Sequence, residues 1–361
     1  MPLPGSLPAA ARAFSPESVR VFRFAGWRLD ARRGLVELGY ALEGDGVHEE
    51  LHEEVDLGLP VNGLDRGRLA VLERAVSLLH LVAGVSYYKT SFAPEIRVDG
   101  GPIDAELADC LRHLYGEGLA ECRYVNDLAG RPAPEFPTVP SSGAAGSAGL
   151  RERPLVPIGG GKDSIVTLEA VRRLEAIPLL FSVGAPPAVL DTIRASGLAE
   201  VTMGRSLDPR LFELNRSGAY NGHVPVTAIN SCLAVIAALI HDASDVVMAD
   251  ERSASVGSLT WDGAEVNHQY SKGWDFERRF ATAVRHQVAS DLRYFSLLRP
   301  WSELAIARSF APLTAYHDAF VSCNRAYLLD AERRTQRWCG DCPKCRFTTL
   351  VLAPFLDRDR V

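Results

Sequence analysis

The N-terminal part of the chain places apolar side chains at every second position in several short runs. Between residues 36 and 42, for example, apolar side chains alternate with Glu37 and Gly39. A period of two is typical of a strand that buries one face, whereas apolar residues three and four positions apart indicate a helix. Together the runs predict a small α+β domain over residues 1–128. The expected strands lie at residues 22–24, 36–42 and 55–59, and the expected helices lie at residues 69–82 and 107–114.

Strands alternate with helices in the second half of the chain. This alternation predicts a parallel α/β sheet over residues 152–361, and such sheets bind ligands at the carboxyl ends of their strands. Residues 129–151 are rich in Pro, Gly, Ser and Ala and predict a linker between the two domains. The expected strands lie at residues 155–158, 179–183 and 246–248, and the expected helices lie at residues 164–174, 187–195 and 224–240.

Composition narrows the class of protein. The 361 residues are 47% hydrophobic and carry a formal charge of −6, which argues against a general nucleic-acid binder. Residues 1–15 have no basic segment followed by an apolar run, and we expect neither a signal peptide nor a membrane partner. The expected compartment is the cytoplasm, and the sequence does not set the oligomeric state.

The acidic run at residues 49–56 could bind a cation, but a solvated strand face is the favoured interpretation.

A glycine-rich loop is the sharpest local motif. Gly159-Gly160-Gly161-Lys162-Asp163-Ser164 follows a predicted strand directly and opens a predicted helix. Glycines let the backbone approach an anion, and the N–H groups at the helix start point towards it. Lys162 adds a positive charge, which makes it a candidate catalytic residue as well as a phosphate ligand, and Asp163 suggests an intervening Mg²⁺. The loop therefore predicts ATP binding; the alternative is a strand–helix turn that binds nothing.

Polar residues elsewhere in this half supply the other candidates. Asp250 and Glu251 follow the strand at residues 246–248, so we expect them near the ATP, where they suit Mg²⁺ or the ribose. His223, His268 and Lys272 are candidate acid and base groups, because His titrates near neutrality and Lys does so when desolvated. Structural hydrogen bonds are the alternative role for each of these three.

A cysteine cluster lies near the C-terminus. Cys339, Cys342 and Cys345 form a C-x-x-C-x-x-C run, and Cys323 can complete a set of four thiolates. Tetrahedral Cys₄ zinc is the favoured interpretation, because thiolates are preferred zinc ligands and leave no open position. An iron–sulfur cluster, a site with three thiolates and simple packing remain alternatives.

The motifs indicate a resemblance to a broad superfamily and, within it, to one family. The loop at residues 159–164 is similar to the pyrophosphate loop of PP-loop ATP pyrophosphatases, with Gly159 in the place of the usual Ser. At a finer level the chain resembles the MurL family. The segments that carry this resemblance are Gly-Gly-Gly-Lys-Asp-Ser at 159–164, Asn-Gly-His-Val-Pro-Val at 221–226, Glu-Arg-Ser-Ala-Ser at 251–255, Asn-His-Gln-Tyr-Ser-Lys at 267–272, Leu-Arg-Pro at 298–300, Ser-Cys-Asn-Arg at 322–325, Trp-Cys-Gly-Asp-Cys-Pro-Lys-Cys at 338–345, and, in the N-terminal half, residues 88–91, 118–121 and 124–126.

The MurL resemblance implies a fold and an activity. The expected fold is an adenine nucleotide alpha hydrolase-like sheet domain with a C-terminal zinc site, preceded by the smaller α+β domain. The expected activity is epimerisation of the terminal L-Glu of UDP-MurNAc-L-Ala-L-Glu to D-Glu, with ATP converted to AMP and pyrophosphate and with Mg²⁺ required. The alternative is another PP-loop adenylylating enzyme, such as a tRNA thiolase or a 7-cyano-7-deazaguanine synthase-like protein.

Overall fold

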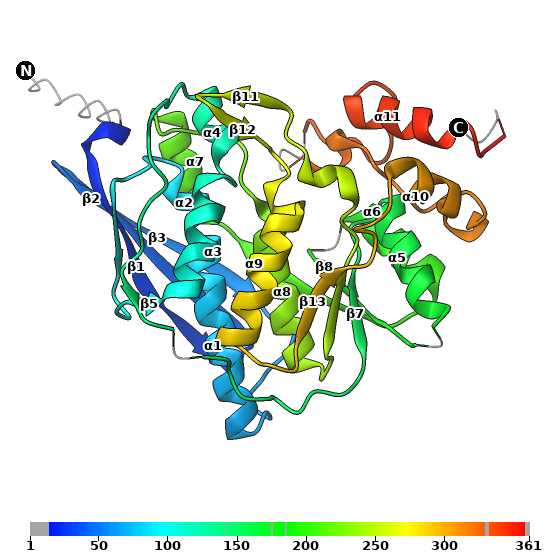
Figure 1. The fold of residues 1–361 in the computed structure, drawn as a ribbon, viewed down its shortest axis with the longest axis horizontal. Helices are drawn as coiled ribbons and strands as arrows, with labels where there is room; N and C mark the ends of the chain where they lie inside the picture. The colour runs from blue at the N-terminus through cyan, green and yellow to red at the C-terminus, as the bar shows by residue number, and fades with distance from the viewer. Residues whose placement is uncertain (1–13, 142, 175, 185, 329–331, 358–361) are drawn as a thin grey trace, which may run out of the picture.

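One nine-stranded mixed sheet runs through the protein, with helices packed on its faces (Figure 1). The computed structural model describes residues 14–141, 143–174, 176–184, 186–328 and 332–357. The order of strands is β13-β10-β7-β8-β9-β3-β2-β1-β4. These strands are β1 (Val19–Asp30), β2 (Leu35–Gly44), β3 (Val47–Asp56), β4 (Glu95–Val98), β7 (Pro154–Pro157), β8 (Leu179–Val183), β9 (Glu200–Ser206), β10 (Asp245–Met248) and β13 (Arg293–Ser296).

Eleven α-helices and two small two-stranded sheets complete the described part of the chain. The helices are α1 (Arg66–Ala83), α2 (Val85–Tyr88), α3 (Ala105–Gly116), α4 (Ala120–Val125), α5 (Lys162–Arg172), α6 (Pro187–Ser196), α7 (Pro209–Arg216), α8 (Val226–Ile240), α9 (Trp274–Gln287), α10 (Glu303–Phe310) and α11 (Pro343–Leu352). The small sheets pair β5 (Ile103–Asp104) with β6 (Thr138–Val139) and β11 (Leu259–Trp261) with β12 (Ala264–Val266).

Strands β7 to β10 and β13 form the parallel part of the sheet. Their side chains alternate between two cores, since Leu155 packs with α8 whereas its neighbour Val156 packs with α5 and α6. From β7 the chain order proceeds outward through β8 and β9 on one side, then returns to β10 and β13 on the other. The switch between β7 and β10 leaves a crevice outside their carboxyl ends, which is where open α/β sheets bind ligands.

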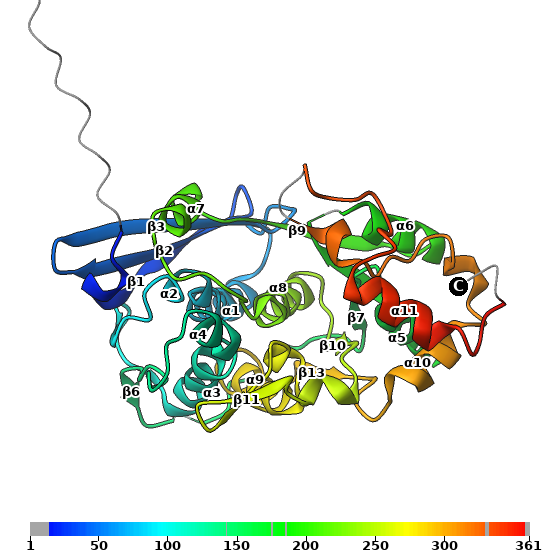
Figure 2. The same ribbon diagram turned by 90° about the horizontal axis from the view of Figure 1, so that it is seen from above.

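The remaining strands extend the same sheet. β9 pairs antiparallel with β3, and β3, β2 and β1 form an antiparallel meander. β4 pairs parallel with β1 and forms the edge of the sheet. α1 packs on this meander and on α8, which belongs to the parallel part, and Figure 2 shows these helices gathered on one side of β1–β3. The expected division into two domains with a linker at residues 129–151 stays a prediction.

The third strand is longer and earlier than expected. It covers Val47–Asp56 and therefore includes the whole acidic run, and because β9 pairs with it, β3 is an inner strand. The solvated interpretation of the acidic run is wrong for Glu53, whose side chain is buried against Arg205. It holds for the exposed side chains of Glu50, Glu54 and Asp56.

One helical stretch among the described residues is long and apolar enough to cross a membrane. It covers Arg66–Tyr88, and 72% of its most apolar window is buried inside the protein. Burial against the sheet and α8 accounts for the composition of Arg66–Tyr88, as it does for core helices in general.

Candidate functional site

A cavity of about 340 Å³ lies at the switch between β7 and β10. Its walls come from the glycine loop, the end of β8, the first turns of α8, the residues after β10, and the segment that contains Cys323. The polar side chains that line it include Asp163, Ser164, Asp250, Lys272 and Lys344. The cavity therefore combines an anion-binding loop with two carboxylates and two ammonium groups.

The glycine loop has the geometry that the motif predicted. Gly159, Gly161, Asp163 and Ser164 line the cavity, and α5 begins directly after Gly161. Gly160 has φ +78°, and a Cβ there would lie 2.7 Å from the hydroxyl oxygen of Tyr327. Only glycine fits this position without strain, because L side chains rarely adopt that backbone conformation. The loop thus exposes free backbone N–H groups of a helix start towards the cavity.

The C-terminal segment holds the loop from outside. The N–H of Val321 donates to the carbonyl oxygen of Gly160 at 2.8 Å, and the Tyr327 hydroxyl donates to the carbonyl oxygens of Gly159 and Val321, both at 3.1 Å. The glycine loop and the cysteine-containing segment are therefore one structural unit, although they lie far apart in the sequence.

Lys162 does not line the cavity. Its ammonium group is buried, lies 2.5 Å from Asp163 Oδ1 and forms a second ion pair with Glu303 at the start of α10. Burial alone would lower the pKa of Lys162, but the two carboxylates outweigh it and raise the pKa above its usual value. Lys162 is thus a fixed cation beneath the loop, whereas the cations that face the cavity are Lys272 and Lys344.

Asp250 and Glu251 lie in different environments. Asp250 lines the cavity, and burial raises the pKa of its carboxyl to about 7. Glu251 is buried and turns back on its own loop, where it accepts hydrogen bonds from the Ser253 N–H and from the Ser253 hydroxyl at 2.9 Å. Of the two residues expected near Mg²⁺, the structure brings Asp250 to the cavity.

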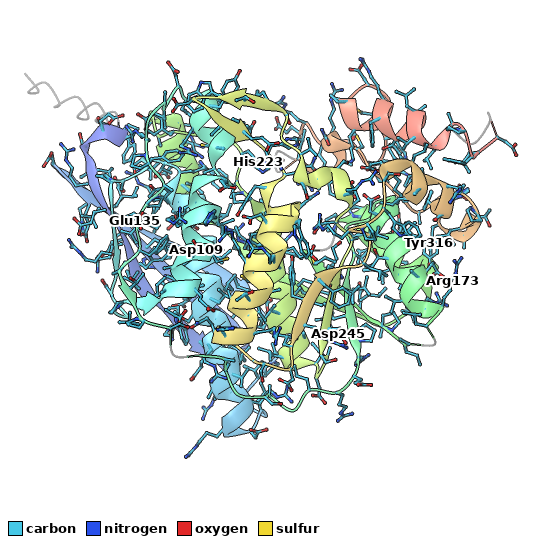
Figure 3. The ribbon with its side chains drawn as sticks, in the orientation of Figure 1. Asp109, Glu135, Arg173, His223, Asp245 and Tyr316 are labelled. Atoms are coloured by element: carbon cyan, nitrogen blue, oxygen red, sulfur yellow. The ribbon has the colours of Figure 1, made fainter. Side chains whose placement is uncertain are left out.

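The three acid–base candidates lie near one another. Lys272 lines the cavity, and the rings of His223 and His268 are 6.0 Å apart in an edge-to-face arrangement. Burial lowers the pKa of His223, with further lowering from His268 and Lys272, while Glu121 opposes the shift. Figure 3 shows His223 between α4 and the loops that follow β10. His223 and His268 are not among the residues that line the cavity, so of the three candidates the structure brings Lys272 to it.

The four cysteines of the C-terminal cluster converge. Their sulfur atoms lie within 4.8 Å of one another, with Cys323–Cys342 at 3.9 Å, Cys339–Cys345 at 3.8 Å and Cys342–Cys345 at 3.5 Å. A tetrahedron with zinc–sulfur bonds of about 2.3 Å has edges of about 3.8 Å, so the donor set fits zinc. Burial by itself would raise the pKa of the Cys342 thiol, but backbone N–H groups of Cys345 and Asn324 help lower it to about 6. Cys342 can therefore supply a thiolate at neutral pH, whereas burial and the hydrogen bond with Cys342 raise the pKa of the Cys345 thiol to about 12.

Several cavity residues were not foreseen from the sequence. Thr227 and Asn230 are three positions apart in the apolar helix α8, so they share the helix face that meets the cavity, and this spacing was a usable signal. Lys344 lies between two clustered cysteines, and Tyr327 follows Cys323 closely; both reach the cavity because the cluster folds over the glycine loop. Glu303 does not line the cavity, and nothing in the sequence indicated that it pairs with Lys162, because the two residues are 141 positions apart.

Comparison with known proteins places the chain in one family. A family model described as the MurL N-terminal domain matches residues 13–297, and one described as the MurL C-terminal domain matches residues 319–361. A protein of Xanthomonas oryzae pv. oryzae named UDP-N-acetyl-alpha-D-muramoyl-L-alanyl-L-glutamate epimerase is 45% identical over 97% of this chain and 77% of its own length. Proteins with the same name from Micromonospora sp. and Salinispora tropica are each 44% identical over 94% of this chain and cover 76% and 74% of their own lengths. The chain therefore belongs to the MurL family.

Proposed function

We propose that this protein epimerises the terminal L-Glu of UDP-MurNAc-L-Ala-L-Glu to D-Glu in the cytoplasm, with ATP cleaved to AMP and pyrophosphate. Relatives named for this epimerisation support the substrate. The use of ATP is supported by one observation above all: the glycine loop, Asp250 and Lys272 line one cavity at the switch point of the parallel sheet. The tRNA thiolase and deazaguanine alternatives have no relative among the matches described above.

The chemistry explains why an epimerase would need a nucleotide site. The α-proton of Glu is very weakly acidic beside a free carboxylate, because removing it places a second negative charge next to the first. Adenylylation of the carboxylate cancels that charge and gives an activated carbonyl, which can accept the electron pair of the breaking C–H bond. Donors around the carbonyl oxygen would then stabilise the enolate. Hydrolysis of the adenylate after inversion would release UDP-MurNAc-L-Ala-D-Glu and AMP.

The roles follow from position in the cavity. The N–H groups around Gly161 and the hydroxyl of Ser164 would hold the ATP phosphates, with positive charge from Lys272 and Lys344. Asp163 and Asp250 would hold Mg²⁺, which when bound neutralises charge on the phosphates. Lys162 would contribute by fixing Asp163.

Proton transfer would use His223, His268 and Lys272, of which Lys272 lines the cavity. His223 is the proposed base, because burial keeps its imidazole neutral and able to accept a proton. Lys272 or His268 would return a proton from the other face of the α-carbon. The zinc proposed at the four cysteines would be structural, since four thiolates leave no open position for a substrate.

Incubation of the purified protein with UDP-MurNAc-L-Ala-L-Glu, ATP and Mg²⁺ tests the proposal. The Glu is then released by acid hydrolysis and its chirality is determined, while pyrophosphate is measured in parallel. We expect D-Glu and pyrophosphate to form together and only when both substrates are present. Inversion that proceeds equally well without ATP would contradict the nucleotide mechanism, and absence of D-Glu would contradict the epimerase.

A further inference from the structure

The loop that carries His223 is fastened to the N-terminal half of the protein. Asn126, directly after α4, donates a hydrogen bond from Nδ2 to the Asn221 carbonyl oxygen at 2.9 Å, and another to the Cys122 carbonyl oxygen at 2.7 Å. The buried ammonium of Lys89 donates to Asn221 Oδ1 at 2.9 Å. Both contacts hold the residue two positions before His223, so the backbone of this loop has a fixed place.

Gly222 brings the loop into direct contact with α4. A Cβ at this position would lie 2.9 Å from the Cα and 3.0 Å from the sulfur of Cys122, so only glycine allows the approach. The next residue along α4 towards the N-terminus is Glu121, and the next residue along the loop is His223. The contact between Gly222 and Cys122 brings the backbone just before His223 against α4, and the charge of Glu121 acts on the His223 ring.

One carboxylate oxygen of Glu121 lacks a hydrogen-bond partner in the described part of the chain. Its Oε2 atom is buried and has no hydrogen-bond partner among the described residues. Such an atom is costly unless something satisfies it, and the nearby imidazole can do so when protonated. The other charged or titratable groups that act on His223 are His268 and Lys272, and both lower its pKa. Glu121 is thus the one anion among the groups that act on His223.

We propose that Glu121 is a positioning residue for His223: it orients the imidazole and stabilises the imidazolium that forms when His223 takes the α-proton. In this step the Cα–H bond breaks, an N–H bond forms on the ring, and the electron pair moves onto the activated carbonyl oxygen. This inference rests on the proposed function, because it assigns the base of that reaction. It also gives the N-terminal half a purpose, since α4 carries the carboxylate and Lys89 fixes the loop.

The direct test is an NMR titration of histidine-labelled protein, with the His223 signal assigned by its loss in His223→Gln. We expect Glu121→Gln to lower the midpoint of His223, because it removes the anion that favours the protonated ring. Glu135→Gln is the matched control, since it removes the same charge from an exposed position, and we expect it to leave the midpoint unchanged. A His223 midpoint that does not move in Glu121→Gln overturns the inference, whether or not the protein is an epimerase.

Epimerase kinetics supply the second test. We expect Glu121→Gln to lower kcat by about tenfold or more with little change in KM, and to move the acidic limb of the pH profile of kcat/KM to lower pH. Glu121→Asp should restore part of kcat. A uniform loss of activity with an unmoved limb, in protein with unchanged circular dichroism, would mean that Glu121 serves only the fold. If the wild type shows no inversion while the His223 midpoint still shifts, the contact stands and the proposed function fails.

Discussion

Arg205 of β9 donates two hydrogen bonds to Glu53 of β3, from Nε to Oε1 at 2.6 Å and from Nη2 to Oε2 at 2.9 Å. The same guanidinium donates to the Ser86 hydroxyl at 2.9 Å. The Glu53 side chain is fully buried, and the pair lies where the parallel part of the sheet meets the antiparallel meander. This ion pair therefore connects the two halves of the sheet through side chains as well as backbone.

Loss of one partner should destabilise the fold strongly. We expect Glu53→Gln to lower the free energy of unfolding by about 3–5 kcal/mol, because it leaves the guanidinium of Arg205 buried without its counter-charge. Urea unfolding followed by circular dichroism measures the change. Glu37→Gln is the matched control, because its partner Arg28 is exposed and the effect should be much smaller. Equal effects of the two variants would contradict the account of the Glu53 pair.

Asp163 should be needed for chemistry on ATP. We expect Asp163→Asn to reduce pyrophosphate release by about 100-fold, the loss typical of removing one electrostatic contact from an active site. The variant keeps the side-chain shape but removes one of the two carboxylates paired with the buried Lys162, so we expect a lower melting temperature with the protein still folded by circular dichroism, because Glu303 remains. Asp45→Asn, on the exposed surface, serves as the control. Near-normal pyrophosphate release in Asp163→Asn would mean that the loop does not handle phosphates.

Asp250 predicts a pH dependence of stability in the protein without ligands. Its folded pKa of about 7 lies above the usual aspartate value of 3.8, so the folded protein retains a proton that the unfolded chain releases. Stability should therefore fall as the pH rises through this window. At 1.36 kcal/mol per pKa unit the effect is at most about 4 kcal/mol, and smaller because the carboxyl borders a solvent-open cavity.

Asp250→Asn should remove that dependence. We expect the variant to be more stable than the wild type at pH 8 and similar to it near pH 4, as measured by urea unfolding at both values. A difference of the same size at both pH values would show that the change comes from packing and that Asp250 does not titrate in this range.

The cysteine cluster predicts bound metal that supports the nucleotide site. Elemental analysis should find about one zinc per chain, and Cys342→Ser should lose most of it. Because Cys323 and Lys344 line the cavity, we expect Cys342→Ser also to weaken ATP binding measured by calorimetry. Cys110→Ala is the control, since Cys110 lies in α3 and outside the cluster. Full zinc content in Cys342→Ser would exclude this cysteine as a ligand.

Local sequence patterns were sufficient for the elements around the site. The apolar run before Gly159, the glycines and the helical pattern after them were enough to predict the strand, the loop and the helix, because each is decided by neighbouring residues. Placing Asp250 at the carboxyl end of a strand needed only the length of that strand. The spacing of Cys339, Cys342 and Cys345 was likewise enough to predict that they meet, and the structure confirms that Cys323 joins them.

The orientation of side chains and their interaction partners could not be predicted from local sequence patterns. Lys162 could have pointed at the cavity or away from it, and Glu303 decided the outcome by packing against α5. Glu53 belongs to an acidic run that looks solvated, yet Arg205 and the pairing of β9 with β3 bury it.

The sequence by itself determined the strand–loop–helix that forms the glycine loop, the carboxylates at the sheet edge and the set of four cysteines. Only the tertiary structure decided that Lys162 lies under the loop, that Asp250 and not Glu251 faces the cavity, and that Glu121 of α4 comes close enough to act on His223. The physical reason is range: backbone conformation follows from neighbouring residues, whereas the environment of a charge depends on which distant segments pack around it.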